Sequence, residues 1–163
     1  MSLLHQNLSG GLEFILTIRS KELRHHAGQI SLPGGRADTA DSCLEHTALR
    51  ECEEEIGLDM NSVEVLGQLD TVFTPSGFCV RLFVAYIESL PELRADPQEV
   101  DEIFHIPLNF ILDQDVYQIG KANINGIKRE FYFFDYKEYY VWGATAGILR
   151  SLSQELNLIL KAS

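Results

Sequence analysis

The 163-residue sequence has few cysteines and no long apolar run. Its three cysteines, Cys43, Cys52 and Cys79, are odd in number and form no Cys-x-x-Cys pair, so neither a disulfide framework nor a structural zinc set is indicated. No stretch approaches the ~18 consecutive apolar residues of a membrane helix. Residues 1–11 hold no basic segment followed by an apolar one, so we predict no signal peptide and a cytoplasmic location.

Positive charge is also scarce. Thirteen Lys and Arg stand against 24 Asp and Glu, which gives a net charge of −11 and disfavours nucleic acids and anionic membranes as partners. The hydrophobic content of 45% and charged content of 23% are typical of a globular protein, and the length predicts one domain over residues 1–163. A small molecule is therefore the favoured partner, and the sequence is also compatible with a homodimer.

Hydrophobic patterning predicts several strands and two main helices without strict strand–helix alternation, which favours an α/β fold with a mixed sheet and helices packed on it. A capping residue, Asp41 or Ser42, and the stop signal Gly57 bound the first main helix. The loop signals are residues 20–32 and 90–98, with tight turns at 74–77 and 124–127. The remaining predicted elements are strands at 12–19, 63–69, 78–87, 100–106, 129–136 and 139–142, a short helix at 108–112 and a final helix at 145–160.

The first main helix carries an acidic cluster near its C-terminal end. At 100° per residue, Glu51, Glu54 and Glu55 fall within an arc of roughly 100°, and Glu53 points elsewhere. Acids so placed repel one another and oppose the helix dipole, and a bound cation would relieve both effects. Carboxylate oxygens suit Mg²⁺ or Mn²⁺. The alternative is a solvated acidic face on which Arg50 pairs with Glu54.

A Gly-Gly loop precedes this helix, and the two features together resemble a known family. Residues 50–58 match the second half of the Nudix hydrolase signature, G-x5-E-x7-R-E-U-x-E-E-x-G-U with U aliphatic, although Cys52 fills the first U position. Asp41 stands where the signature has Glu, and one extra residue separates it from Arg50. The resemblance therefore implies a Nudix-like box over about residues 35–58.

The upstream segment is similar to one branch of that family, the coenzyme A diphosphatases. Their pattern is L-L-T-x-R-S-x3-R-x3-G-x3-F-P-G-G, and residues 15–35 keep its spacing, with Ile15 for the first Leu and Leu32 for Phe. Segments 74–78, 99–102 and 142–147 resemble later landmarks, so the resemblance covers about residues 14–155. It implies a Nudix-type α/β/α sandwich whose first strand is shortened or absent.

The resemblance implies hydrolysis of coenzyme A (CoA) or acyl-CoA to 3′,5′-ADP and (acyl-)4′-phosphopantetheine, with Mg²⁺ or Mn²⁺ as cofactor. One alternative is another nucleoside diphosphate derivative, such as ADP-ribose or a dinucleotide. The other is a non-catalytic Nudix-like domain that binds a nucleotide as a sensor. The full set of helix acids favours the enzyme.

Roles follow for individual residues. Glu51 and Glu55 are the expected metal ligands, and Glu54 is expected to join them or to bind a second ion. The resemblance adds the Gly35 carbonyl. Arg50 is expected to orient a glutamate of the helix. We favour Glu99 as an auxiliary base, with Glu54 and Glu102 as alternatives. The basic stretch 19–36 is expected to read phosphate, and the residues proposed for it are Arg19, Arg24, His25 and Arg36.

Overall fold

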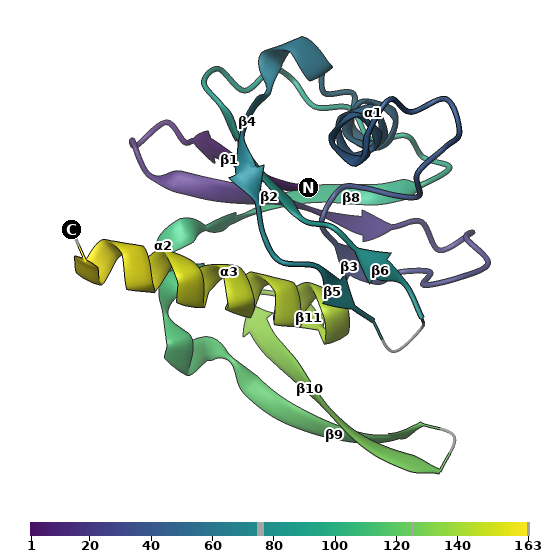
Figure 1. Ribbon diagram of the computed structural model, residues 1–163, viewed down its shortest axis with the longest axis vertical. Coiled ribbons are helices and arrows are strands. Elements are labelled where there is room, and N and C mark those ends of the chain that lie inside the picture. Colours follow the sequence, from purple (N-terminus) through teal and green to yellow (C-terminus); the bar gives the residue numbers. More distant parts are fainter. Residues whose placement is uncertain (75–76, 125, 163) are drawn as a thin grey trace. The chain divides into compact units, whose positions relative to one another are not determined.

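The computed structural model describes residues 1–74, 77–124 and 126–162. The chain divides into two compact units, Met1–Pro107 and Leu108–Ser163, which are described one after the other. The single domain expected over residues 1–163 stays a prediction. The mixed sheet and the helices confirm the predicted α/β fold (Figure 1).

The first unit is built on a six-stranded sheet with the order β3-β2-β1-β7-β4, in which β8 also pairs with β2. Strands β1 and β7 run parallel, and the other pairs in the sheet are antiparallel. Since β8 pairs with residues 13–19 of β2, the short partners β1 and β3 share the other edge of that strand. The strands are β1 (Ser2–Gln6), β2 (Leu12–Arg19), β3 (Ile30–Ser31), β4 (Glu64–Gln68), β7 (Phe83–Ile87) and β8 (Val100–Pro107).

Helix α1 (Leu44–Ile56) lies across one face of this sheet (Figure 1). One side of α1 faces the sheet, and Cys52 and Ile56 are buried there. They pack with sheet residues that alternate along the strands, so this face of the sheet and one face of α1 form the core. The buried members of the core are Met1, Leu3, Ile15, Cys52, Ile56, Leu58, Phe83, Ala85 and Ile87.

The two ends of α1 test the predicted helix boundaries. Gly57 ends the helix in the left-handed conformation, with φ 67°, as predicted. The predicted N-cap was wrong: the cap is Cys43, whose sulfur accepts a hydrogen bond from the His46 amide. Asp41 does not cap the helix because its carboxylate binds side chains of the helix instead.

Several short elements differ from the sequence predictions. Residues 2–6, which the sequence left unassigned, form β1. The predicted loop 20–32 contains β3, and the predicted strand 78–87 is divided into β6 (Cys79–Val80) and β7. Strand β6 pairs with β5 (Val72–Phe73), and a short 3-10 helix, η1, covers Met60–Ser62. The turn predicted at 74–77 includes residues 75 and 76, which lie outside the described residues.

The second unit is a three-stranded antiparallel sheet with α3 packed on β10. Residues 118–124, unassigned by the sequence, form the first of its strands, and the predicted turn 124–127 includes residue 125, outside the described residues. None of the described helices is long and apolar enough to cross a membrane. The elements are α2 (Leu108–Leu112), η2 (Gln114–Val116), β9 (Gln118–Ile124), β10 (Ile127–Tyr136), β11 (Tyr139–Trp142) and α3 (Gly143–Ala162).

Candidate active site

Three carboxylates of the first unit converge. Glu51 and Glu55 come from α1, and Glu99 immediately precedes β8. Each offers one oxygen, and the three oxygens all lie within 4.8 Å of one another. Three acids this close repel one another unless protons or a cation reduce their charge.

Glu55 is the most deeply buried of the three, with 1% of its surface exposed. The Gly34 amide donates to its Oε2 at 3.0 Å, and the Arg19 guanidinium lies 3.6 Å from its Oε1. Burial nevertheless raises the pKa of Glu55 to about 7, because these two partners only partly offset desolvation. The surroundings of Glu55 therefore supply too little positive charge to stabilise its ionised form.

Glu51 sits directly against the Gly-Gly loop. A Cβ added at Gly35 would overlap the Glu51 carboxylate, so any larger residue at this position would displace the carboxylate from where it lies. Burial also raises the pKa of Glu51, although Arg50 donates to its Oε1 at 3.0 Å. The Gly-Gly loop and helix α1 therefore have complementary shapes where Gly35 meets Glu51.

Backbone hydrogen bonds hold Glu99 beside the helix acids. The Ser20 amide donates to the Glu99 carbonyl at 2.8 Å, and the Glu99 amide donates to the Asp96 carbonyl at 3.0 Å. Ser20 directly follows β2, so the end of that strand fixes the start of β8. This pairing brings Glu99 to the acids of α1.

Arg50 links the acids to the loop before the helix. Its Nε and Nη2 donate to the Asp41 carboxylate at 3.0 and 3.2 Å, and its Nη1 donates to Glu54 at 2.7 Å. With the contact to Glu51, the guanidinium meets three carboxylates. Arg50 holds the pKa of Asp41 well below its usual range. This is the arrangement of a residue that positions acids.

The other predicted site residues lie in different surroundings. Glu54 is half exposed and pairs with Arg50 outside the three-carboxylate group, so the open alternative of an Arg50–Glu54 pair is present in the structure. Arg19 faces Glu55. Arg24 and His25 are exposed, and the Arg36 guanidinium lies 4.8 Å from the centre of the Phe78 ring.

Sequence reasoning missed two features of this site. It placed Glu99 near the site only as a base, whereas the structure groups it with Glu51 and Glu55. It also assigned no partner to Asp41, although the correspondence of Asp41 with the signature glutamate was a usable signal. The grouping of Glu99 depends on contacts between residues distant in sequence, whereas Asp41 and Arg50 are nine residues apart and meet where the loop turns into α1.

The residues fit a divalent metal ion. The oxygen-only donor set suits Mg²⁺ or Mn²⁺, and the uncompensated charge of the buried acids is what a cation would neutralise. Glu51, Glu55 and Glu99 would hold the ion. The Gly35 backbone lies beside Glu51 and could add its carbonyl.

The chain also matches a known family by sequence. The family model described as the NUDIX domain matches residues 6–124. The chain belongs to the Nudix family. Among curated relatives, the uncharacterized Nudix hydrolase NudL of Yersinia enterocolitica is 40% identical over 144 residues, covering 88% of this chain and 74% of the relative. The NudL of Photorhabdus laumondii is 38% identical, covering 88% and 77%.

Solved structures agree on the fold. A C. elegans Ap4A hydrolase binary complex aligns with a TM-score of 0.63 over 99% of this chain and 96% of that one, at 16% identity. The MutT protein of Methanosarcina mazei Go1 has a TM-score of 0.52 and 28% identity, covering 68% and 77%. The NUDIX domain of Shewanella oneidensis NrtR, complexed with ADP ribose, has 0.51 and 26%, covering 68% and 71%.

The family fixes the general activity. This Nudix hydrolase is a diphosphatase that acts on a nucleoside diphosphate derivative, a small molecule. Nudix hydrolases typically use a divalent metal ion, and the three-carboxylate group offers donors of the matching kind.

Proposed function

We propose that this Nudix hydrolase cleaves the diphosphate of CoA or acyl-CoA. Water adds to one phosphorus and the P–O–P bridge breaks, which gives 3′,5′-ADP and (acyl-)4′-phosphopantetheine with release of a proton. Mg²⁺ or Mn²⁺ is the proposed cofactor. CoA or acyl-CoA is thus proposed as the particular nucleoside diphosphate derivative that this Nudix hydrolase cleaves.

One observation carries this choice of substrate. The upstream segment that resembles coenzyme A diphosphatases supplies partners to all three acids. Arg19 and Gly34 contact Glu55, Ser20 binds the Glu99 backbone, and Gly35 makes room for Glu51. Because these pattern residues contact the acidic group, they support the proposal that the pattern belongs to the active site.

Each acid has a proposed task. Glu51, Glu55 and Glu99 hold the metal, which when bound would neutralise phosphate charge and acidify a water molecule. Arg50 keeps Glu51 and Glu54 in position through its contact with Asp41. Glu54, half exposed and outside the three-carboxylate group, is proposed to take the proton from water, and Glu99 is the alternative base.

The basic stretch gives the proposed phosphate contacts. Arg24, His25 and Arg36 are exposed and available to a ligand, whereas Arg19 is engaged with Glu55. A guanidinium on phosphate makes charge-assisted, often bidentate hydrogen bonds. The 3′-phosphate of CoA is therefore the proposed partner of Arg24 or Arg36.

ADP-ribose is the second candidate substrate. The Shewanella oneidensis NUDIX domain, 26% identical to this chain, was solved with ADP ribose bound. ADP-ribose carries the same diphosphate but no 3′-phosphate. The basic stretch 19–36 therefore distinguishes the two candidates.

A hydrolysis screen tests the substrate. CoA, acetyl-CoA, a long-chain acyl-CoA, ADP-ribose and NADH are each incubated with the enzyme and Mg²⁺ or Mn²⁺, and products are separated by chromatography. We expect 3′,5′-ADP from CoA or an acyl-CoA at the highest kcat/KM. A higher value for ADP-ribose or NADH would refute the CoA assignment and leave the diphosphatase activity standing.

Variants of the helix acids test the metal site in the same assay. Glu51→Gln and Glu55→Gln each remove ligand charge with little change in shape, so turnover should fall by orders of magnitude. Glu53→Gln is the matched control, because Glu53 is exposed on the same helix and outside the three-carboxylate group. Wild-type turnover in both ligand variants would overturn the metal assignment.

Dephospho-CoA tests the reading of the 3′-phosphate. If the basic stretch binds that phosphate, dephospho-CoA should show a lower kcat/KM than CoA, and Arg24→Ala or Arg36→Ala should narrow the difference. The Arg contact matters only when its phosphate partner is present. Equal efficiency of the wild-type enzyme on both compounds would contradict this reading.

A further inference from the structure

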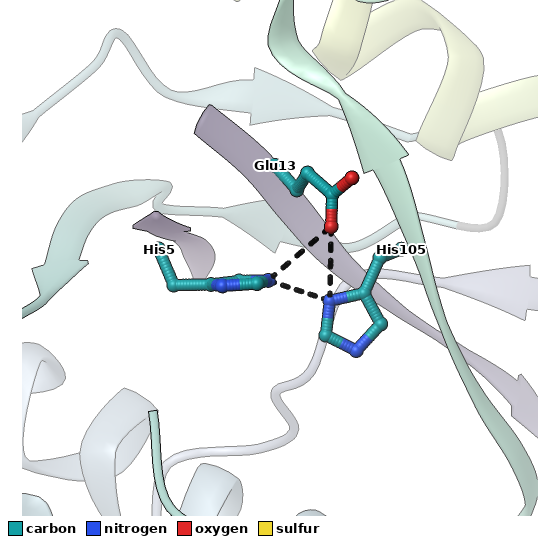
Figure 2. A group of neighbouring side chains, drawn as sticks. All are labelled: His5, Glu13 and His105. Atoms are coloured by element: carbon teal, nitrogen blue, oxygen red, sulfur yellow. Dashed lines mark hydrogen bonds and ion pairs between the residues drawn. The ribbon is translucent and has the colours of Figure 1, made fainter. Parts of the chain in front are cut away.

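A second group of metal-ligating side chains lies on the same sheet, away from the three carboxylates. His5 on β1, Glu13 on β2 and His105 on β8 point toward one another (Figure 2). His5 Nε2 lies 2.6 Å from His105 Nδ1. Glu13 Oε2 lies 3.8 Å from the first nitrogen and 3.9 Å from the second.

The strand register explains why these three side chains meet. His5 pairs directly with Glu13 across β1 and β2, and His105 pairs with Ile15, two residues further along β2. Side chains two residues apart in a strand share a face. The three side chains therefore sit on one face of the sheet, each fixed by its own strand.

Backbone and side-chain partners orient two of the donors. His5 Nδ1 lies 3.2 Å from the Gln6 carbonyl, which can only accept, so Nδ1 carries the proton and the Nε2 lone pair faces the group. The Asn7 amide donates to Glu13 Oε1 at 2.9 Å, which leaves Oε2 directed at the two nitrogens. Metal-binding histidines and carboxylates are held by partners of this kind.

The three side chains of this group are mostly shielded from solvent. The side chains of His5, Glu13 and His105 are 6%, 22% and 30% exposed. Burial, followed by the neighbouring His5, lowers the pKa of His105, while Glu13 acts in the opposite direction. Because His5 Nε2 accepts, His105 Nδ1 is the donor in the 2.6 Å contact, and its proton must move to His105 Nε2 before Nδ1 can bind a metal.

We propose that His5, Glu13 and His105 form a binding site for a transition-metal ion, with Zn²⁺ as the favoured occupant. Two imidazoles and one carboxylate are a donor set that suits zinc and other first-row transition metals, unlike the oxygen-only donors at the active site. The partly exposed Glu13 and His105 leave the fourth coordination position to water.

The geometry needs little adjustment to receive the ion. Ligand atoms at about 2.0–2.1 Å from a tetrahedral zinc lie about 3.4 Å apart. The two Glu13 distances are within about half an ångström of that value, and the two nitrogens must separate by less than 1 Å. Ring rotation of the two histidines supplies a movement of this size.

The proposed zinc site is separate from the active site. Glu13 and Arg19, which contacts Glu55, stand six residues apart on β2, and at ~3.3 Å per residue this is about 20 Å. The buried residues Leu3 and Ile15 lie on the sheet face that carries His5, Glu13 and His105. Each is two residues along its strand from one of these ligands. A zinc ion held here would tie β1, β2 and β8 together without touching the phosphate-binding residues.

Metal titration of the full chain tests the site. Protein stripped with EDTA is placed in excess Mg²⁺, which occupies hard oxygen sites, and is titrated with Zn²⁺ by calorimetry and with Co²⁺ by visible absorption. We expect one tight Zn²⁺ per chain and the intense d–d bands of four-coordinate Co²⁺, which oxygen-only octahedral sites lack.

Variants assign the binding to these residues. Glu13→Gln and His105→Gln should abolish the Co²⁺ bands, and Asn7→Ala should weaken Zn²⁺ binding ~10-fold because Asn7 orients Glu13. His26→Gln is the matched control, since His26 is exposed and bonds Gln29 outside this group, and it should bind like wild type. Circular dichroism of each variant confirms that it is folded, and the nearly isosteric Glu13→Gln decides the matter if His105→Gln does not fold.

The outcomes separate this proposal from the proposed function. Absence of the Co²⁺ bands from wild-type protein, or Zn²⁺ binding that Glu13→Gln and His105→Gln leave unchanged, would overturn the zinc site. Glu51→Gln should retain the Co²⁺ bands while losing hydrolysis. Loss of the bands in Glu51→Gln would assign the bound ion to the active site and also overturn the proposal.

Discussion

Gly35 lies so close to Glu51 that a methyl group on its Cα would overlap the Glu51 carboxylate. The glycine is needed here for its missing side chain and not for an unusual backbone, because Gly34 and not Gly35 has a positive φ. The loop before α1 and the acids of α1 are therefore matched in shape.

Gly35→Ala should displace the Glu51 carboxylate and reduce turnover at least 10-fold, because a ligand moved by about 1 Å no longer fits the metal. Hydrolysis measured against Mg²⁺ concentration should show a higher metal requirement. Gly67→Ala is the control: a Cβ at Gly67 meets nothing within 4 Å, so its activity should stay near wild type. Normal metal dependence in Gly35→Ala would contradict the assigned contact.

Asp41 should be needed for its charge. Asp41→Asn keeps the size of the side chain but removes the carboxylate that Arg50 binds through two nitrogens, so Arg50 should hold Glu51 and Glu54 less well. We expect turnover to fall roughly 10-fold, the scale of losing a partner that orients a ligand. Asp41→Glu, which restores the residue of the family signature, should retain more activity than Asp41→Asn, and the reverse order would refute this role.

Glu99 and Glu54 should respond differently to metal. If Glu99 joins Glu51 and Glu55 as a ligand, Glu99→Gln should raise the Mg²⁺ concentration needed for half-maximal rate. If Glu54 is the base, Glu54→Gln should lower kcat by ~10²-fold or more at saturating Mg²⁺ without that shift. A low kcat in Glu99→Gln with unchanged metal dependence would transfer the role of base to Glu99. Glu102→Gln, run in parallel, tests the remaining acid of this segment.

Local signals were enough to predict much of the fold. The extent of β2, the helix α2 and the strand β11 agree with the sequence prediction, as does Gly57 at the end of α1. Each of these depends on a hydrophobic run or a breaker within a few residues. The clustering of Glu51 and Glu55 follows equally from helix geometry.

Non-local contacts account for what the sequence could not predict. Strand β1 is stabilised by pairing with both β2 and β7, and the short segment 2–6 does not by itself reveal these partners. The sequence predicts Arg19 to be one of several phosphate-binding cations, whereas in the structure its guanidinium faces Glu55. His5 and His105 are 100 positions apart and meet only through the register of β1, β2 and β8.

Glu55 predicts how metal-free protein responds to pH. Burial raises its pKa from 4.5 to about 7, so between these values the folded chain binds a proton that the unfolded chain has lost. This contribution to stability is therefore complete below pH 4.5 and disappears as the pH rises through 7. The free energy involved is on the order of 3 kcal/mol.

Glu55→Gln mimics the protonated form and keeps an acceptor for the Gly34 amide, so it should not lose this stability. Urea unfolding in EDTA at pH 5 and pH 8 should show Glu55→Gln gaining on wild type as the pH rises. Glu53→Gln, an exposed neighbour, should show no such gain. A constant difference between Glu55→Gln and wild type would mean that Glu55 titrates normally, and the argument for a buried acid that needs a cation would fail.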